Sequence, residues 1–170
     1  MKPNVLNLMN EQIRNELESA YLYLSMAVYL EGQNLEGMAG WMRAQVHEET
    51  IHGMKLLNHL LTRGEAAKLV DVKQRKTEWS SVLEVWEETY KHEQFVTGKI
   101  HELLGAARDA KDYATELLMQ WFVGEQVEEE STASRVLDLA RRAGDSKHGV
   151  LMLDHQLRHR GPPEGSPFAR

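Results

Sequence analysis

The sequence contains no cysteine among its 170 residues, only four prolines, and few aromatic residues, which make up 7% of the chain. Without cysteine, the chain cannot form disulfides, attach haem through thioethers, or build thiolate zinc sites and rubredoxin-type iron centres. Any metal site must therefore rely on carboxylates and imidazoles. The lack of cysteine is also compatible with the cytoplasm, which is the location we expect.

Long hydrophobic runs are missing as well. The longest apolar stretch, residues 20–30, is about half as long as the ~20 residues that a membrane-spanning helix needs. The N-terminal segment is interrupted early by Asn10, Glu11 and Arg14, so it lacks the apolar centre of a secretory signal. We therefore expect no transmembrane segment and no membrane partner.

The charge balance is acidic, with a formal net charge of −6 and an isoelectric point near 5.8. Binding to a phosphate backbone depends on clustered Lys and Arg, so we expect no nucleic-acid partner and favour cations instead. The length fits one domain with a sizeable core. We predict a single domain over residues 1–160 and a flexible tail, GPPEGSPFAR, over residues 161–170.

Apolar residues recur at alternating spacings of three and four, which is typical of one face of a helix, and the alternation of a strand is absent. Gly64 suits a C-terminal helix cap, and Ser81 with Glu84 has capping-box spacing. Residues 65–80 lack helical patterning and are long enough to travel the length of a bundle. The predicted helices cover residues 5–33, 35–63, 81–108, 112–144 and 146–158.

Two short connections and one long crossover between four long helices predict an all-α fold, a four-helix bundle with a single crossover and a short fifth helix at the C-terminal end. At 1.5 Å per residue, each long helix would span ~40 Å. The predicted core face of the third helix holds Leu83, Trp86, Tyr90, Glu93, Thr97, Ile100 and Leu104. The predicted core face of the fourth holds Leu118, Trp121, Glu125, Glu129, Thr132, Val136 and Leu139.

Each long helix places at least one carboxylate on its core-facing stripe, near the middle of its length. A buried, unpaired carboxylate is strongly destabilising, so a cluster of them needs a compensating cation or protons. His52 follows Glu49 at i, i+3, so both side chains can point at one site, and carboxylates with imidazole suit iron or manganese. The inward-facing carboxylates are Glu16, Glu49, Glu93, Glu125 and Glu129.

Two further glutamates, Glu48 and Glu128, lie one position from the stripe. They are either solvated or part of a flanking cation site. The other histidines do not converge on the cluster, and we assign them no role; those considered are His47, His59, His92 and His101.

Four segments resemble a known family. They are NEQ at 10–12 leading to Glu16 and Tyr23, HEETIH at 47–52, ETYKHEQ at 88–94, and QWFVGEQVEEE at 120–130. On these segments the chain resembles the bacterial non-haem ferritins over nearly its whole length. The resemblance implies a ferritin-like four-helix bundle that stores iron and acts as a ferroxidase, oxidising Fe²⁺ with dioxygen or peroxide.

The resemblance also implies the ligands of two irons. One iron would be held by Glu16, Glu49 and His52, and the second by Glu93 and Glu129 with Glu49 as the bridge. Loss of Glu49 should therefore abolish rapid oxidation.

A third site is implied at Glu48, Glu125, Glu128 and Glu129. The family assembles homo-oligomeric cages of two dozen subunits around a ferric oxyhydroxide store, so a 24-subunit cage is expected here. Neither expectation follows from the periodicity of the sequence.

The sequence differs from the motifs of two related families, and these differences favour the bacterial non-haem ferritins over both. A bacterioferritin normally carries a second Glu-x-x-His on the fourth helix, but the residue three after Glu129 is Thr132. Its haem-ligating methionine would align near Thr50, so we expect no haem, and Met54 is read as an ordinary helix methionine. Rubrerythrin-like peroxidases usually append a cysteine-rich iron module, which this chain lacks.

Two residues are candidates for supporting roles in catalysis. Tyr23 lies on the same face as Glu16, and its hydroxyl can bond a metal ligand or supply an electron. Gln126 can orient a ligand or a bound water, or can merely pack beside the core.

Three other functions stay open. An oxygenase would use similar di-iron chemistry but needs an apolar pocket beside the metals. A DNA-protecting mini-ferritin usually has basic tails, which are missing. A structural bundle without metal leaves the buried carboxylates unexplained.

Overall fold

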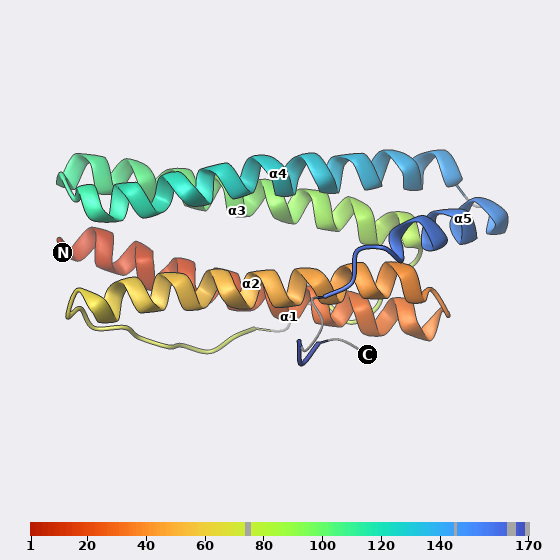
Figure 1. Ribbon diagram of the computed structural model, residues 1–170, viewed down its shortest axis with the longest axis horizontal. Helices are drawn as coiled ribbons and strands as arrows, with labels where there is room; N and C mark the ends of the chain where they lie inside the picture. Colours follow the sequence, from red (N-terminus) through yellow and green to blue (C-terminus); the bar gives the residue numbers. More distant parts are fainter. Residues whose placement is uncertain (74–75, 145, 163–165, 169–170) are drawn as a thin grey trace.

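The computed structural model describes residues 1–73, 76–144, 146–162 and 166–168, and within these residues the chain forms helices and no strand. Four long helices lie side by side, and a short fifth helix crosses one end of the bundle (Figure 1). The predicted all-α fold is confirmed, and every helix boundary falls within two residues of its predicted position. The helices are α1 (Pro3–Gly32), α2 (Glu36–Thr62), α3 (Val82–Ala110), α4 (Tyr113–Ala143) and α5 (Lys147–Leu157).

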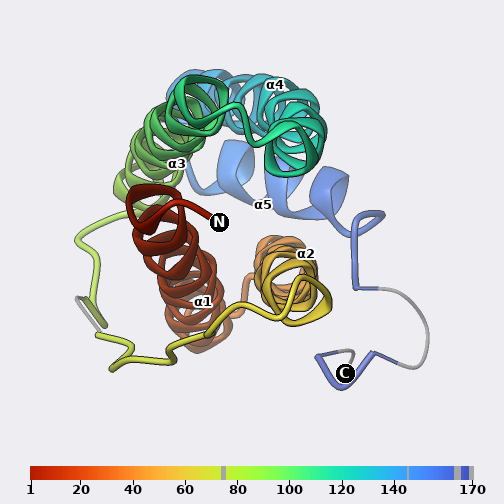
Figure 2. The ribbon, with the colours of Figure 1, turned by 90° about the vertical axis from the view of Figure 1, so that its left-hand side faces the viewer.

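The bundle consists of two antiparallel hairpins, α1 with α2 and α3 with α4, which meet where α1 packs on α3 (Figure 2). The segment between α2 and α3 returns the chain along the outside of α1 to the opposite end of the bundle (Figure 1). Ser25 Oγ donates to the Lys76 backbone oxygen at 2.8 Å and fastens this crossover to α1. The predicted long crossover is therefore present.

Short-range hydrogen bonds and one glycine conformation stabilise the end of α2 and the start of α3. Gly64 adopts a φ of 69°, which a side chain would disfavour, and ends α2 as predicted. Ser81 Oγ accepts from the Glu84 N–H at 3.1 Å at the start of α3. The Glu84 carboxylate turns to the Ser80 N–H, at 2.6 Å, instead of completing the predicted capping box on Ser81.

The hydrophobic core is divided in two along the bundle axis. One cluster gathers around Met26, Trp41 and Trp86, and the other around Leu56 and Phe122. Buried polar side chains lie between the two clusters. The helices therefore carry their polar residues to a common level near the middle of the bundle.

The predicted core faces of α3 and α4 are partly wrong. On α4, Trp121 is 37% exposed and Glu125 is only half-buried, whereas the neighbouring Phe122 and Gln126 face the core. On α3, the buried face holds Trp86, Glu93 and Ile100 as predicted, but Val85, Thr89, Val96 and Leu103 replace Leu83, Tyr90, Thr97 and Leu104, which are half-buried. Apolar residues on both sides of each stripe make its centre ambiguous by one position.

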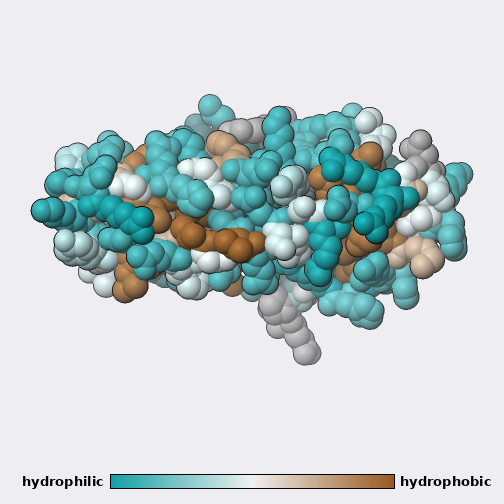
Figure 3. All heavy atoms as spheres, turned by 90° about the horizontal axis from the view of Figure 1, so that it is seen from above, coloured by the Kyte–Doolittle hydropathy of each residue, from teal (hydrophilic) through white to brown (hydrophobic). Residues whose placement is uncertain are grey.

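The face formed by α3 and α4 is mostly hydrophilic with separate hydrophobic patches (Figure 3). Exposed apolar side chains occur on α4 and on the crossover, among them Leu117, Val127, Leu69 and Val70. Across the described residues, no helix is both long and apolar enough to cross a bilayer.

The C-terminal segment is described only in part. Ser166 Oγ lies 3.2 Å from His47 Nδ1, and the Phe168 ring packs edge-on to the same histidine. Residues 163–165 and 169–170 of the predicted tail lie outside the described residues. The flexibility of this tail, and the domain boundary at residue 160, stay predictions.

Candidate metal centre

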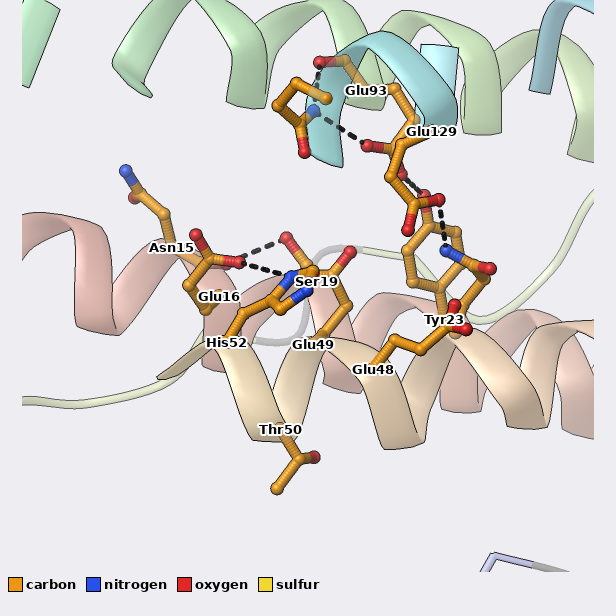
Figure 4. Close-up of polar contacts among 12 residues, drawn as sticks. Asn15, Glu16, Ser19, Tyr23, Glu48, Glu49, Thr50, His52, Glu93 and Glu129 are labelled. Carbon is orange, nitrogen blue, oxygen red and sulfur yellow. Dashed lines mark hydrogen bonds and ion pairs between the residues drawn. The ribbon is translucent and has the colours of Figure 1, made fainter. Parts of the chain in front are cut away.

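The polar level between the two apolar clusters is the candidate functional site. Every long helix contributes to it, and its side chains converge on the axis of the bundle (Figure 4). Because little water reaches this level, each charge there needs a partner. The buried polar residues are Gln12, Asn15, Glu16, Ser19, Gln45, Glu49, His52, Glu93, Gln126 and Glu129.

Glu16, Glu49 and His52 form the tightest group. Each offers one ligand atom, and these three atoms lie within 4.8 Å of one another. His52 Nδ1 is 3.7 Å from Glu16 Oε2 and 3.5 Å from Glu49 Oε2. Both of these oxygens are buried without a hydrogen-bond partner. Buried, unpartnered carboxylate oxygens beside an imidazole make a donor set that suits a divalent iron ion.

Glu93 approaches the group from α3 on the opposite side of the bundle (Figure 4). The Tyr23 hydroxyl donates a hydrogen bond to Glu93 Oε1. The Gln126 amide donates to Glu93 Oε2 at 3.1 Å and to the Glu93 backbone oxygen at 3.3 Å. Tyr23 and Gln126 therefore both hydrogen-bond to the carboxylate of a candidate ligand.

Glu129 joins the site from α4. Gln45 Nε2 donates to Glu129 Oε2 at 2.9 Å across the bundle. Glu48 lies on the flank of the site, where it is half-buried and its Oε2 is 3.0 Å from Arg160 Nη2. Glu129 therefore faces the centre, whereas Glu48 marks its edge.

Burial sets the electrostatics of these carboxyl groups. Burial, and then the neighbouring Glu49 charge, raises the pKa of Glu16 well above its usual value. Burial and the charge of Glu93 raise the pKa of Glu49 in the same way, and burial raises the pKa of Glu93 against the hydrogen bond from Tyr23. The pKa of Glu129 rises to about 7 through burial and the charges of Glu93 and Glu48. Protons held at these carboxyl groups would be released when cations bind.

Three of the four residues predicted for the third site are less buried than the candidate ligands of the first two sites. Glu125 is half-buried and Glu128 is exposed, because the buried face of α4 is rotated from the predicted one. Among the described residues, the metal-compatible group holds Glu16, Glu49 and His52, and it includes neither the second-site residues Glu93 and Glu129 nor Glu48, Glu125 and Glu128. The three residues that the family comparison raised as haem or second-histidine positions, Thr50, Thr132 and Met54, all lie outside the buried cluster.

Two supporting residues were missed in the sequence. Gln12 Nε2 donates to Glu16 Oε1 at 2.7 Å, and Gln45 serves Glu129 in the same way. Each precedes a candidate ligand, Glu16 or Glu49, by four residues, so a polar residue one turn before a buried glutamate was the available signal.

His92 also lies closer to the site than expected. Its Nε2 is 2.7 Å from Ser19 Oγ, and its ring packs edge-on to Tyr23. His92 falls one position before Glu93, off the predicted core face of α3, so the sequence pattern indicates no role for it.

Comparison with known proteins agrees with this architecture. The sequence profile of the Ferritin family, described as a ferritin-like domain, matches residues 6–143. A bacterial non-heme ferritin of Bacteroides fragilis (strain 638R) is 40% identical over 154 residues, which cover 91% of this chain and 96% of that protein. One of Escherichia coli O157:H7 is 37% identical over 157 residues, covering 92% and 95%.

Solved structures give the same result. A crystal structure described as a novel open pore ferritin from Archaeoglobus fulgidus superposes with a TM-score of 0.92 at 42% identity, covering 94% of this chain and 99% of that one. The iron-storage and ferroxidase functions expected from the sequence are thereby confirmed. With a family profile across most of its length, relatives that are 37% to 42% identical, and the buried cluster in place, the chain belongs to the ferritin family, among the bacterial non-haem ferritins.

Proposed function

We propose that this ferritin oxidises iron at a paired site in the middle of the bundle. Glu16, Glu49 and His52 hold the first ferrous ion, and Glu49 bridges to a second ion held by Glu93 and Glu129. The observation that carries the proposal is the group of three ligand atoms, from Glu16, Glu49 and His52, within 4.8 Å of one another, where Glu16 Oε2 and Glu49 Oε2 are buried without a hydrogen-bond partner.

The donor set favours oxidation. Anionic carboxylates stabilise Fe³⁺ more than Fe²⁺, so they lower the reduction potential of the bound iron. Each Fe²⁺ gives one electron to the oxidant, dioxygen or peroxide, and the ferric product leaves for storage. His52 supplies one neutral donor, while Tyr23 and Gln126 keep Glu93 in place.

Three finer features belong to the same proposal. Glu48, Glu125, Glu128 and Glu129 form a third cation position beside the paired site. Subunits assemble into a 24-subunit cage, for which the exposed apolar residues of α4 and the crossover offer contact surface. The expected cytoplasmic location stays a prediction.

The oxygenase alternative gains no support from the pocket beside α1. That pocket, of about 590 Å³, lies between α1, α3 and the crossover. Its lining is rich in charged side chains, including Glu18, Lys73, Lys76, Glu87 and Lys91. None of the candidate ligands of the paired site lines this pocket, so it is not the pocket beside the metals that an oxygenase would need.

Stopped-flow absorbance after mixing Fe²⁺ with metal-free protein in air tests the paired site. We expect wild type to show a fast phase that is lost in Glu49→Ala and Glu49→Gln, since both variants lack the bridging carboxylate. Glu102→Ala, which removes an exposed glutamate of α3, is the matched control and should keep the fast phase.

Size-exclusion chromatography and circular dichroism of each variant establish that the cage and the helices persist. Unchanged oxidation in both Glu49 variants would refute the bridging assignment. Oxidation by wild type no faster than in a protein-free mixture would refute the ferroxidase site itself.

A further inference from the structure

The residues after α5 bring a positive charge to the edge of the candidate metal centre. Leu157, the last residue of α5, is buried in the same apolar cluster as Trp41. The Arg160 N–H donates to the Leu157 backbone oxygen at 3.1 Å, so the chain turns back towards α2 at this point. Arg160 therefore has a position fixed by the end of α5.

The Arg160 side chain lies between an aromatic ring and a carboxylate of α2. Its guanidinium carbon is 4.8 Å from the centre of the Trp41 ring, a cation–π distance. Its Nη2 is 3.0 Å from Glu48 Oε2, and its Nη1 is buried without a hydrogen-bond partner. The guanidinium therefore contacts Trp41 and Glu48 and keeps one donor, Nη1, without a hydrogen-bond partner.

The same guanidinium acts on the inner carboxylates. The charge of Glu48 raises the pKa of both Glu49 and Glu129, and the charge of Arg160 lowers the pKa of Glu129. Arg160 and Glu48 therefore act on the pKa of Glu129 in opposite directions. In the ion pair, Arg160 is 32% exposed and Glu48 is 38% exposed, so water reaches both groups.

We propose that Arg160 is a tethered cation that occupies Glu48 and competes with iron for the position between Glu48 and Glu129. The proposal rests on the third cation position of the proposed function. It makes Arg160 a positioning residue: it holds Glu48 ready while the position is empty, and it must move aside when a metal ion binds.

The ion pair between Arg160 and Glu48 is weak enough for a metal ion to displace Arg160. Half-exposed ion pairs contribute little, because water screens them and two side chains lose freedom. A doubly charged ion bound to two carboxylates interacts more strongly than one guanidinium bound to one carboxylate. Iron can therefore displace Arg160, whereas a singly charged ion of the buffer gains less from doing so.

Zinc titration by calorimetry tests the proposal with a metal that undergoes no oxidation. Metal-free cages of wild type and Arg160→Gln are titrated with Zn²⁺. We expect one class of Zn²⁺ sites to bind about fivefold more tightly in Arg160→Gln, the change that one half-exposed ion pair supports. Arg160→Lys keeps a positive charge and should stay close to wild type.

Arg158→Gln is the matched control, because it removes the same charge two residues earlier. Arg158 pairs with Asp154 instead of Glu48, with its Nε 3.6 Å from Asp154 Oδ2. Its Zn²⁺ isotherm should match wild type. The double variant Arg160→Gln with Glu48→Gln should lose the gain, which assigns the tightened sites to Glu48.

Identical isotherms for wild type and Arg160→Gln would overturn the proposal, and so would a gain that persists in the double variant. An equal gain in Arg158→Gln would also overturn it, by reducing the effect to general charge. The zinc comparison does not depend on oxidation, so a wild type that fails to oxidise iron would refute the ferroxidase site while leaving this test intact.

Discussion

Gly37 and Asp154 lie in such close contact that no side chain fits between them. A methyl group on Gly37 would come within 1.9 Å of the Asp154 backbone oxygen and 2.7 Å of Arg158 Cγ. The Asp154 carboxylate also accepts from the Met38 N–H at 2.9 Å and satisfies one of the free N–H groups at the start of α2. Helix α5, and with it Arg160, is held on α2 by a contact that only glycine permits.

Gly37→Ala should loosen α5 from the bundle. We expect a cost of about 1–3 kcal/mol, the usual range for overpacking, and a melting temperature lower by several degrees. Gly40→Ala is the control in the same helix, because a methyl group there meets nothing within 4 Å. Alanine favours a helix over glycine by up to ~1 kcal/mol, so this variant should melt at or above wild type. Equal melting temperatures in the two variants would contradict the contact.

Periodicity was sufficient to predict most of the fold. The spacing of apolar residues located all five helices, and the unpatterned residues 65–80 identified the crossover. Glu16, Glu49 and His52 were predictable as neighbours, because each lies on an unambiguous stripe near the middle of its helix. Burial of all three agrees with that reasoning.

The rest depends on long-range contacts that periodicity does not encode. On α4, apolar residues such as Trp121 and Val127 flank the stripe, so its centre was misplaced by one residue and Glu125 was assigned to the core. The partnership of Arg160 with Glu48 joins residues 112 positions apart through the docking of α5. No local pattern in either segment points to the other.

Tyr23→Phe should weaken the second iron position most at low pH. The Tyr23 hydrogen bond lowers the pKa of Glu93, which burial raises. Without the hydroxyl, the pKa of Glu93 rises further, so protons compete more strongly with metal for this carboxylate. We expect the amplitude of fast iron oxidation to fall severalfold relative to wild type at about pH 6, and much less at about pH 8.

Tyr21→Phe removes a hydroxyl from an exposed tyrosine of the same helix and serves as the control. Its amplitude should follow wild type at both pH values. A deficit in Tyr23→Phe that does not change with pH would argue against an effect through Glu93 and for a direct role of the hydroxyl.

The stability of the metal-free protein should fall as the pH rises towards 7. The pKa of Glu129 is about 7 in the folded state against 4.5 in the unfolded chain, so the folded state holds more protons between these values. The contribution of Glu129 to the free energy of unfolding is therefore fully present below about pH 4.5 and is lost as the pH rises through about 7. Through this one group, the free energy of unfolding falls by at most ~1.4 kcal/mol per pH unit.

Glu129→Gln removes this proton uptake while keeping the shape of the side chain. Urea unfolding of chelator-treated protein between about pH 5 and pH 7 should therefore show a flatter slope in Glu129→Gln than in wild type. Glu128→Gln, which removes an exposed charge from the neighbouring position, should keep the wild-type slope. Parallel slopes in wild type and Glu129→Gln would mean that Glu129 titrates alike in folded and unfolded chains.

Bound metal should reverse the sign of this dependence. A cation binds the carboxylate form, so saturating Zn²⁺ stabilises the folded state more as the pH rises and fewer protons compete with it. Wild type with Zn²⁺ should therefore become more stable between about pH 5 and pH 7, over the range in which the metal-free protein becomes less stable. If Zn²⁺ shifts stability equally at both ends of this range, its binding releases no protons, and the buried carboxyl groups are not its ligands.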